Sequence, residues 1–480
     1  MRRLRSFFLS LNKETNMTRS TLLEHTGSLT PKPRVHYLDH PFDVPEHASR
    51  VGLTLRFHKR ELAQLFVALF DPTQFRGSRM NPGAKGDIQL DLWVAPDSSS
   101  EGGVAGTLAA GTWRAQIDIE RLGEDVEYQL IVYADFDAVP GAVDLTFPEN
   151  HSVKADAGWY RGELHAHSTE SDGKHTVDTV IQAAVDTGLD FFALTDHFTN
   201  SQWRKLLPHL EKPIALLRSV EITSHHGHAN LHGLKSWVDV YVDRPDWSMN
   251  QAADAVHAQG GLFCVNHAFS GDLGWRDFDF DWDRADLMEI YHNLEGCNNA
   301  FQLMLWDQHL NAGRRLIGVG GIDSHNPFEG RHKLGQLVTW VEADSLSEQG
   351  IADGLRRGRV YVSRGQQIRF SAQSGDHRAQ MWESLIAGGQ PIKLDIEILT
   401  DEDIRLFVIR NGYYFDSVRV SAQAGVWQSF QFADQPRQPS YYRIELHSDA
   451  QHDDYRGIMW RDHDTMRALS NPIWVNRPMR

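Results

Sequence analysis

Residues 162–173 read GELHAHSTESDG, and this stretch carries the first signal for the fold. It starts as a short strand-like segment, which ends in two histidines, His165 and His167. Residues two apart on an extended segment leave it on the same face, so both imidazoles can bind one cation. Two surface histidines would give the same local pattern, so the assignment depends on residues further along the chain.

Polar residues also close other predicted strands downstream. The strand-ending residues are Asp196, His197, Glu221, His267, Asp323 and His325. In a barrel of parallel strands the carboxyl ends meet at one face, where catalytic residues collect. The sequence therefore predicts that these scattered residues form one metal site.

The central segment alternates between predicted strands and helices. The expected strands are at 162–167, 190–197, 214–223, 228–234, 261–267, 285–292, 315–325 and 335–341. The expected helices are at 175–188, 201–210, 250–259, 300–313 and 346–358. Alternating units with nearly continuous apolar strands are typical of a parallel sheet, either open or closed into a barrel.

The flanking segments show a different pattern of apolar and polar residues. Short runs of alternating apolar and polar residues, such as DIQLDLWVA at 87–95 and PIKLDIEIL at 391–399, are broken by stretches rich in Gly, Pro, Asp and Ser. This pattern favours antiparallel β-sandwiches. We therefore predict a disordered tail (1–34), an N-terminal β-sandwich (35–157), a central metallohydrolase barrel (158–367) and a C-terminal β-sandwich (368–480).

Composition excludes several classes of protein. With 64 acidic and 48 basic residues the formal charge is -16, which argues against a nucleic-acid-binding surface. Two cysteines form no disulfide framework, and no stretch approaches the roughly 18 apolar residues of a membrane span. The chain is thus expected to be cytoplasmic, with a small-molecule substrate and no membrane partner. A homo-oligomer is allowed.

The motifs GELHAHSTESDG, ALTDH, SVEIT, GHANLHGL, CVNH and GGIDSH, taken in this order, resemble those of the polymerase and histidinol phosphatase (PHP) family. The resemblance spans about 160–365. It implies an α/β fold with a distorted (β/α)7 barrel and a two- or three-metal site used mostly to hydrolyse phosphoesters. Segments outside the barrel, such as FDPTQFRG at 70–77 and GRVYVSRG at 358–365, look most similar to the carbaryl hydrolase (CehA/McbA-like) branch.

The resemblance also implies roles for particular residues. The first metal would be held by His165, His167, Glu221 and Asp323. Glu221 would be shared with a second metal, completed by His267 and His228, and a third would be held by Asp172, His197 and His325. Because His228, Asn230 and His232 alternate along one strand and face the same way, the choice of ligand among these three stays open. We assign Asp196 and His228 to the catalytic set, with Asp196 orienting a ligand rather than binding metal.

Imidazole mixed with carboxylate suits Zn, Mn or Fe. Water bound to such ions has its pKa lowered to about 7, so a bridging hydroxide could attack phosphorus at neutral pH. The leading prediction is therefore a phosphoesterase with a phosphorylated small-molecule substrate. The alternative is a carbamate or carboxyl ester hydrolase that uses the same hydroxide. A third interpretation is a non-catalytic binding module in which the sandwiches capture a sugar or a protein.

Overall fold

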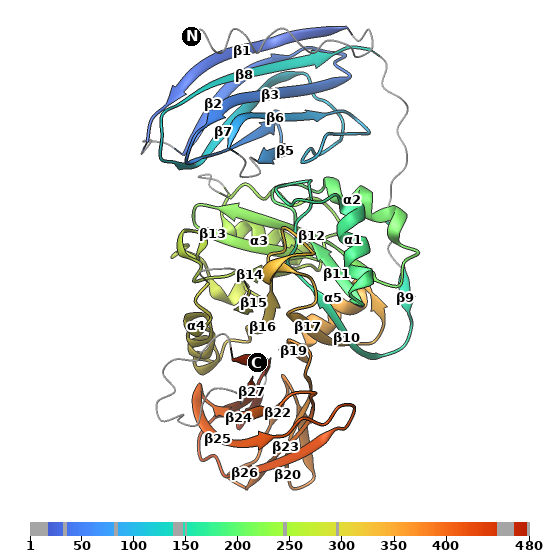
Figure 1. Cartoon of the computed structure of the whole chain (residues 1–480), viewed down its shortest axis with the longest axis vertical. Coiled ribbons are helices and arrows are strands. Elements are labelled where there is room, and N and C mark those ends of the chain that lie inside the picture. Colours follow the sequence, from blue (N-terminus) through green and yellow to red (C-terminus); the bar gives the residue numbers. More distant parts are fainter. Residues whose placement is uncertain are drawn as a thin grey trace. The chain divides into compact units, whose positions relative to one another are not determined.

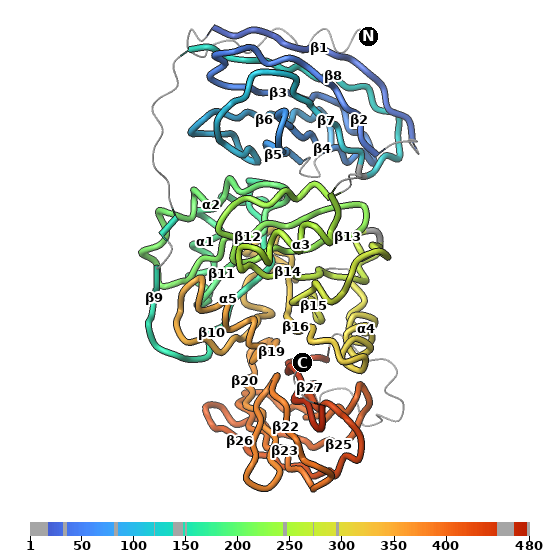
Figure 2. Tube along the Cα trace, turned by 180° about the vertical axis from the view of Figure 1, so that it is seen from behind, coloured from blue at the N-terminus to red at the C-terminus, as the bar shows by residue number. Residues whose placement is uncertain are grey.

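The computed structural model describes residues 18–31, 36–80, 85–137, 147–148, 151–242, 247–293, 297–448 and 465–477. The chain divides into two compact units, Met1–Asp144 and Leu145–Arg480 (Figures 1 and 2). Across these described ranges, no helix combines the length and the apolar character needed to cross a membrane.

The first unit is a β-sandwich, as the sequence predicted. Its strands are β1 (Arg19–Leu29), β2 (Tyr37–Val44), β3 (Arg50–Lys59), β4 (Ala63–Phe70), β5 (Phe75–Met80), β6 (Gly86–Val94), β7 (Gly111–Leu122) and β8 (Val126–Asp135). They form two antiparallel sheets in the orders β1-β8-β3-β6 and β2-β7-β4-β5. Alternate residues of β6, namely Ile88, Leu90, Leu92 and Val94, enter one apolar core with residues of the other sheet.

The predicted tail at residues 1–34 is wrong for its middle part. Residues 19–29 form β1, which pairs with β8 from Arg19 opposite Asp135 to Leu29 opposite Val126. Only Leu29 is fully buried in this strand, so the stretch lacks the apolar alternation by which a strand is recognised. Residues 1–17 and 32–34 of the predicted tail lie outside the described residues.

The second unit starts with a mixed set of strands and helices. The strands are β9 (Ser152–Lys154), β10 (Gly158–Glu163), β11 (Phe191–Leu194), β12 (Ala215–Ser224), β13 (Gly227–His232), β14 (Leu262–Val265), β15 (Leu287–His292), β16 (Ile317–Gly321), β17 (Val338–Ala343), β18 (Leu346–Ser347) and β19 (Val360–Ser363). The helices are α1 (Val177–Asp186), α2 (Ser201–Leu206), α3 (Met249–Ala258), α4 (Asn299–Ala312) and α5 (Glu348–Arg357), with 3-10 turns η2 (Leu207–His209), η3 (Gly271–Leu273), η4 (Trp282–Arg284) and η5 (Gly330–His332). Helices α1 to α4 lie around the outside of the strands (Figures 1 and 2).

The main sheet of this unit runs in the order β16-β15-β14-β13-β12-β11-β10-β17-β19. The expectation of purely parallel strands is wrong at β13, which is antiparallel to both β12 and β14, and at β17, which is antiparallel to β10 and β19. The chain reverses between β12 and β13 in a tight turn that ends at Gly227, whose φ of 129° suits glycine. A hairpin needs no crossover helix, and none separates these strands.

A complete (β/α)7 barrel is not established by this pairing. One isolated parallel bridge, between Ala166 and Ser324, joins the chain just beyond β10 to the chain just beyond β16. Two backbone hydrogen bonds support it, from His167 N to Ser324 O (2.9 Å) and from Ser324 N to His165 O (3.1 Å). The first and last strands that carry predicted ligands are thereby held side by side.

The C-terminal strands pack as a second sandwich-like pair of sheets. They are β20 (Gln367–Ser374), β21 (His377–Gln380), β22 (Ser384–Leu385), β23 (Ile392–Leu399), β24 (Ile404–Arg410), β25 (Tyr413–Val420), β26 (Gln428–Asp434), β27 (Ser440–Ser448), β28 (Met466–Ser470) and β29 (Ile473–Val475). One sheet has the order β21-β20-β23-β26, whereas the other continues the main sheet through β19-β28-β27-β24-β25. A shared apolar core fills the space between them. These strands belong to the same compact unit as the central segment.

Candidate metal centre

The predicted site residues come from the ends of neighbouring strands. His165 and His167 follow β10, Asp196 and His197 follow β11, and His267 follows β14. Asp323 and His325 follow β16, whereas Glu221 lies near the end of β12. His228 lies near the start of β13, but because β13 runs back along β12 its backbone is paired with Thr223, two residues beyond Glu221. The antiparallel strand thus brings His228 to the same end of the sheet.

The structure gathers all nine predicted ligands into three groups that could each hold a metal ion. In every group the potential ligand atoms lie within 4.8 Å of one another. The groups are His165, His167, Glu221 and Asp323; Glu221, His228 and His267; and His167, Asp172, His197 and His325. Glu221 and His167 each belong to two groups, so adjacent groups share a residue.

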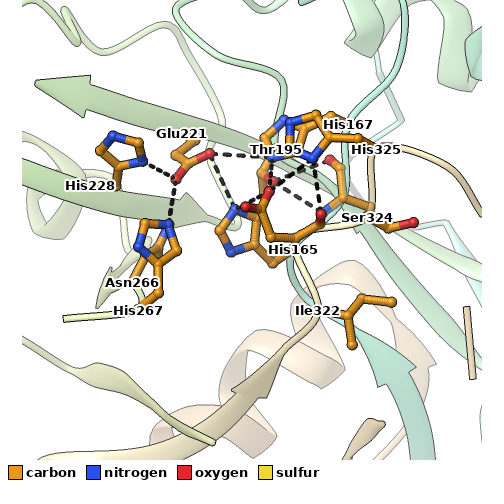
Figure 3. A network of polar contacts seen from close by, with 12 residues as sticks. His165, His167, Thr195, Glu221, His228, Asn266, His267, Ile322, Ser324 and His325 are labelled. Atoms are coloured by element: carbon orange, nitrogen blue, oxygen red, sulfur yellow. Dashed lines mark hydrogen bonds and ion pairs between the residues drawn. The ribbon is translucent and has the colours of Figure 1, made fainter. Parts of the chain in front are cut away.

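The two carboxylate oxygens of Glu221 face different partners. Oε1 lies 3.2 Å from His228 Nδ1 and accepts a hydrogen bond from Asn266 Nδ2 (2.9 Å), whereas Oε2 lies 3.1 Å from His165 Nε2. Figure 3 shows His228, Asn266 and His267 on one side of this carboxylate and His165, His167 and His325 on the other. Glu221 therefore stands between two groups, as a bridging ligand must.

Burial and charge set the protonation of these groups. Burial opposes ionisation of Glu221, but the neighbouring charged His165 outweighs it and holds the pKa of Glu221 well below its ordinary value. Burial lowers the pKa of His197 to about 3 despite the attraction of Glu221, so its imidazole is neutral. Glu221 and His197 can therefore each donate a lone pair to a metal, whereas the carboxylates around His165 raise the pKa of this buried ring well above its ordinary value, so a metal would displace a proton there.

His267 provides a test of whether a cation fits. It is 1% exposed, and neither ring nitrogen finds a hydrogen-bond partner among the described residues. Its Nε2 is 3.7 Å from Glu221 Oε1, beyond hydrogen-bond distance. A buried polar ring in this state is unfavourable, and a cation between the two side chains would give Nε2 a partner. The residues therefore fit a metal centre.

Solvent reaches the group of His167, Asp172, His197 and His325, which we call the outer group; the other two are the inner groups. The side chains of His165, His167 and Glu221 are fully buried, whereas that of His325 is 30% exposed and that of Asp172 is 19% exposed. His325 Nε2 lies 3.2 Å from Asp172 Oδ1. A substrate would therefore reach the cluster from the side of Asp172 and His325.

The structure separates the three alternating residues of β13. His228 lies in the group with Glu221 and His267. The Asn230 side chain donates to Leu164 O (3.3 Å), and His232 Nδ1 is hydrogen-bonded to Ser219 Oγ (3.0 Å). Of the three, His228 alone is placed with the carboxylate and histidine groups.

Asp196 has a different neighbourhood from the one expected for an orienter of a histidine. Its carboxylate accepts hydrogen bonds from Ser168 N (2.8 Å), Ser168 Oγ (2.8 Å) and Ser171 Oγ (2.7 Å). These residues precede Asp172 in the loop after β10. Asp196 thus holds the loop that carries Asp172 rather than a ligand ring.

Three polar partners of the cluster were missed by sequence reasoning. Asn266 contacts Glu221, Thr223 Oγ1 is hydrogen-bonded to His197 Nδ1, and Glu289 contacts His165. A rule based on strand ends could not find Glu289, which lies inside β15 in the run LMEIYH. The available signal was an acidic residue within a buried apolar strand, since such a charge needs a partner.

Two solved structures show a distant likeness to this chain. No family model matches the sequence, and no curated protein matches it. Among solved structures, a Bacteroides vulgatus two-domain protein containing a predicted PHP-like metal-dependent phosphoesterase matches 68% of this chain and 99% of its own, at 18% identity and a TM-score of 0.38. An amidohydrolase from Chromobacterium violaceum matches 35% of this chain and 88% of its own, at 14% identity and a TM-score of 0.26.

Proposed function

We propose that the chain is a metal-dependent hydrolase that cleaves phosphoesters at a site for two or three divalent ions. The observation that carries this proposal is the sharing of Glu221 and His167 between adjacent groups, which would keep neighbouring ions close together. Two neighbouring ions could hold one phosphoryl group between them. Each of the three groups would hold one ion, and His228 would complete the group of Glu221 and His267. Asp196 would fix the loop that carries Asp172.

When bound, divalent ions would supply positive charge for the oxygens of the substrate and a water of lowered pKa. The residues of the chain supply the geometry. The ring of His167 stacks against those of His197 and His325, with centroids 4.3 Å and 4.4 Å away, which restrains all three imidazoles. The inner groups are closed to solvent, so a substrate would meet the site at Asp172 and His325.

We also propose that β10 to β16 act as the distorted (β/α)7 barrel expected from the sequence, with the C-terminal strands as a separate sandwich from about residue 368. The bridge between Ala166 and Ser324 supports a closed ring of strands. Closure would bring the ends of β10 and β16 together, and their two motifs supply His165, His167 and Asp323, three of the four residues of one group.

Carbamate or carboxyl ester hydrolysis is the second proposal, and an apolar ring near the outer group favours it. Phe328, three residues beyond His325, is 51% exposed and packs edge-on against His175 at 5.1 Å between centroids. An exposed aromatic ring at this position would suit an apolar leaving group.

We expect the purified protein to hold about two to three equivalents of Zn, Mn or Fe, because it offers three ligand groups. Elemental analysis after expression with added metal measures this. Less than half an equivalent would contradict the proposal of a metal centre.

An activity panel on the metal-loaded protein tests the reaction. We expect hydrolysis of bis(p-nitrophenyl) phosphate to exceed hydrolysis of 1-naphthyl carbamates. Activity on carbamates alone would replace the first proposal by the second. Full metal content without activity on either would favour a binding module.

A further inference from the structure

A buried carboxylate behind the cluster has no role in the proposed chemistry so far. Glu289 lies within β15 and is 1% exposed, with apolar residues on both sides along the strand. Ionisation of a buried carboxylate is costly unless donors surround it. The partners of Glu289 therefore indicate what it does.

Its two oxygens contact two different predicted ligands. Oε1 lies 2.7 Å from Nδ1 of His165, and Oε2 accepts a hydrogen bond from the backbone N–H of His267 at 2.8 Å. His165 belongs to one group of the cluster and His267 to another. One carboxylate thus contacts a residue of each inner group.

The first contact fixes the proton on the His165 ring. An ionised carboxylate can only accept, so His165 Nδ1 must carry the proton. Nε2 lies 3.1 Å from Glu221 Oε2 and 3.5 Å from Asp323 Oδ1, and when a metal displaces its proton the lone pair of Nε2 faces an ion held with these two carboxylates. This is the tautomer that a metal held with Glu221 and Asp323 requires.

The space for Glu289 depends on a glycine in the neighbouring strand. A Cβ at Gly321 would overlap with Oε1 of Glu289 and lie 2.5 Å from its Cδ. Any other residue at this position would therefore displace the carboxylate. The second glycine of the GGIDSH motif thus leaves room for Glu289.

We propose that Glu289 is a positioning residue that orients His165 and the backbone of His267 for metal binding, in the space left by Gly321. This inference rests on the proposed metal centre. Glu289, His165 and His292 also form a group within 4.8 Å, which could itself suggest an ion. Because Nε2 is the ring nitrogen that faces Glu221 and Asp323, Nδ1 keeps its proton and we assign its contact with Glu289 to positioning, and a fourth ion becomes an outcome of the test.

The test compares zinc affinity, measured by competition with a chromophoric chelator, in the wild type and in Glu289→Gln. Glutamine keeps the shape but has one acceptor oxygen for two donors, so one contact is lost. We expect zinc binding to weaken about 10–100-fold, the usual effect of removing a partner behind a metal ligand. In a His165→Ala background the same change should have a much smaller effect, because the ring that Glu289 orients is gone.

A second pair of variants moves the carboxylate without removing its charge. Gly321→Ala should weaken zinc binding as Glu289→Gln does. Gly320→Ala is the matched control, since its new methyl would meet Cγ1 of Val362 at 2.7 Å rather than Glu289. Circular dichroism of the metal-free proteins checks that all variants are folded.

Each outcome decides the inference. Unchanged zinc affinity in both Glu289→Gln and Gly321→Ala would overturn it, and an equal loss with and without His165 would overturn the orienting of His165 and leave only the contact with His267. The loss of one whole zinc equivalent from the tightly bound set would make Glu289 a ligand of a fourth ion instead. A wild-type protein that binds no zinc, manganese or iron would refute the proposed function itself, and the role of Glu289 with it.

Discussion

Glu221→Gln should lose at least one metal ion and about a thousandfold in turnover, equivalent to about 4 kcal/mol of barrier. Glu221 is the carboxylate whose two oxygens face separate groups. The substitution keeps the volume but removes the negative charge between two cations. At such short range Coulomb energies amount to several kcal/mol even with an effective dielectric near 20. The repulsion between the ions would then be less well offset, so one would dissociate.

The control for this variant is His226→Gln. His226 is exposed in the turn between β12 and β13, only five residues away, and belongs to none of the three groups. It should keep both metal content and turnover. Elemental analysis and steady-state kinetics on the two proteins give the comparison. Full metal content and near-normal turnover in Glu221→Gln would show that the cluster is built around other carboxylates.

Much of the candidate site could be predicted because its residues close apolar strands. His165, His197, His267 and Asp323 each come after a strand of four to six residues, and side chains at the ends of adjacent strands meet. The positions of the strand ends could not reveal which other side chains contact the ligands. Glu289 faces the cluster from inside a strand, and its contacts depend on the register between β15 and β16, where it is paired with Val319. The register between two strands is set by tertiary contacts, so the sequence of one strand does not predict it.

The fold was predictable where alternation is strong and less so elsewhere. The buried and exposed residues of β23 alternate regularly, and its bounds, Ile392–Leu399, nearly match the predicted run. Strand β13, by contrast, is buried throughout, so its sequence gives no sign of direction. Its direction is set by the turn before it, and a turn that reverses the chain makes an antiparallel pair. The division of the second unit near residue 368 stays a prediction, because the main sheet continues across it through β19 and β28.

The contact between the central segment and the C-terminal strands has a buried ionic core. Arg443 of β27 is 0% exposed, and its guanidinium donates to both carboxylate oxygens of Asp307 on α4 at 3.1 Å and 2.9 Å. Tyr441 Oη donates to the same carboxylate (2.8 Å), and Glu445 accepts from Arg443 Nη1 (2.5 Å). This network joins elements that the sequence assigned to separate domains.

Asp307→Ala should therefore lower the free energy of unfolding of the second unit by about 3 kcal/mol. Removing one partner of a buried ion pair typically costs about 3–5 kcal/mol, since the other charge stays buried, and the remaining contact with Glu445 places the expected loss at the lower end. Urea unfolding followed by tryptophan fluorescence measures the change. Asp283→Ala is the control, because it breaks an exposed pair with Arg314 (2.8 Å), whose side chains are 72% and 39% exposed, and should cost under about 1 kcal/mol. If Asp307→Ala costs no more than this control, Arg443 is stabilised by Glu445 and its other neighbours alone, and α4 is not anchored to β27 by charge.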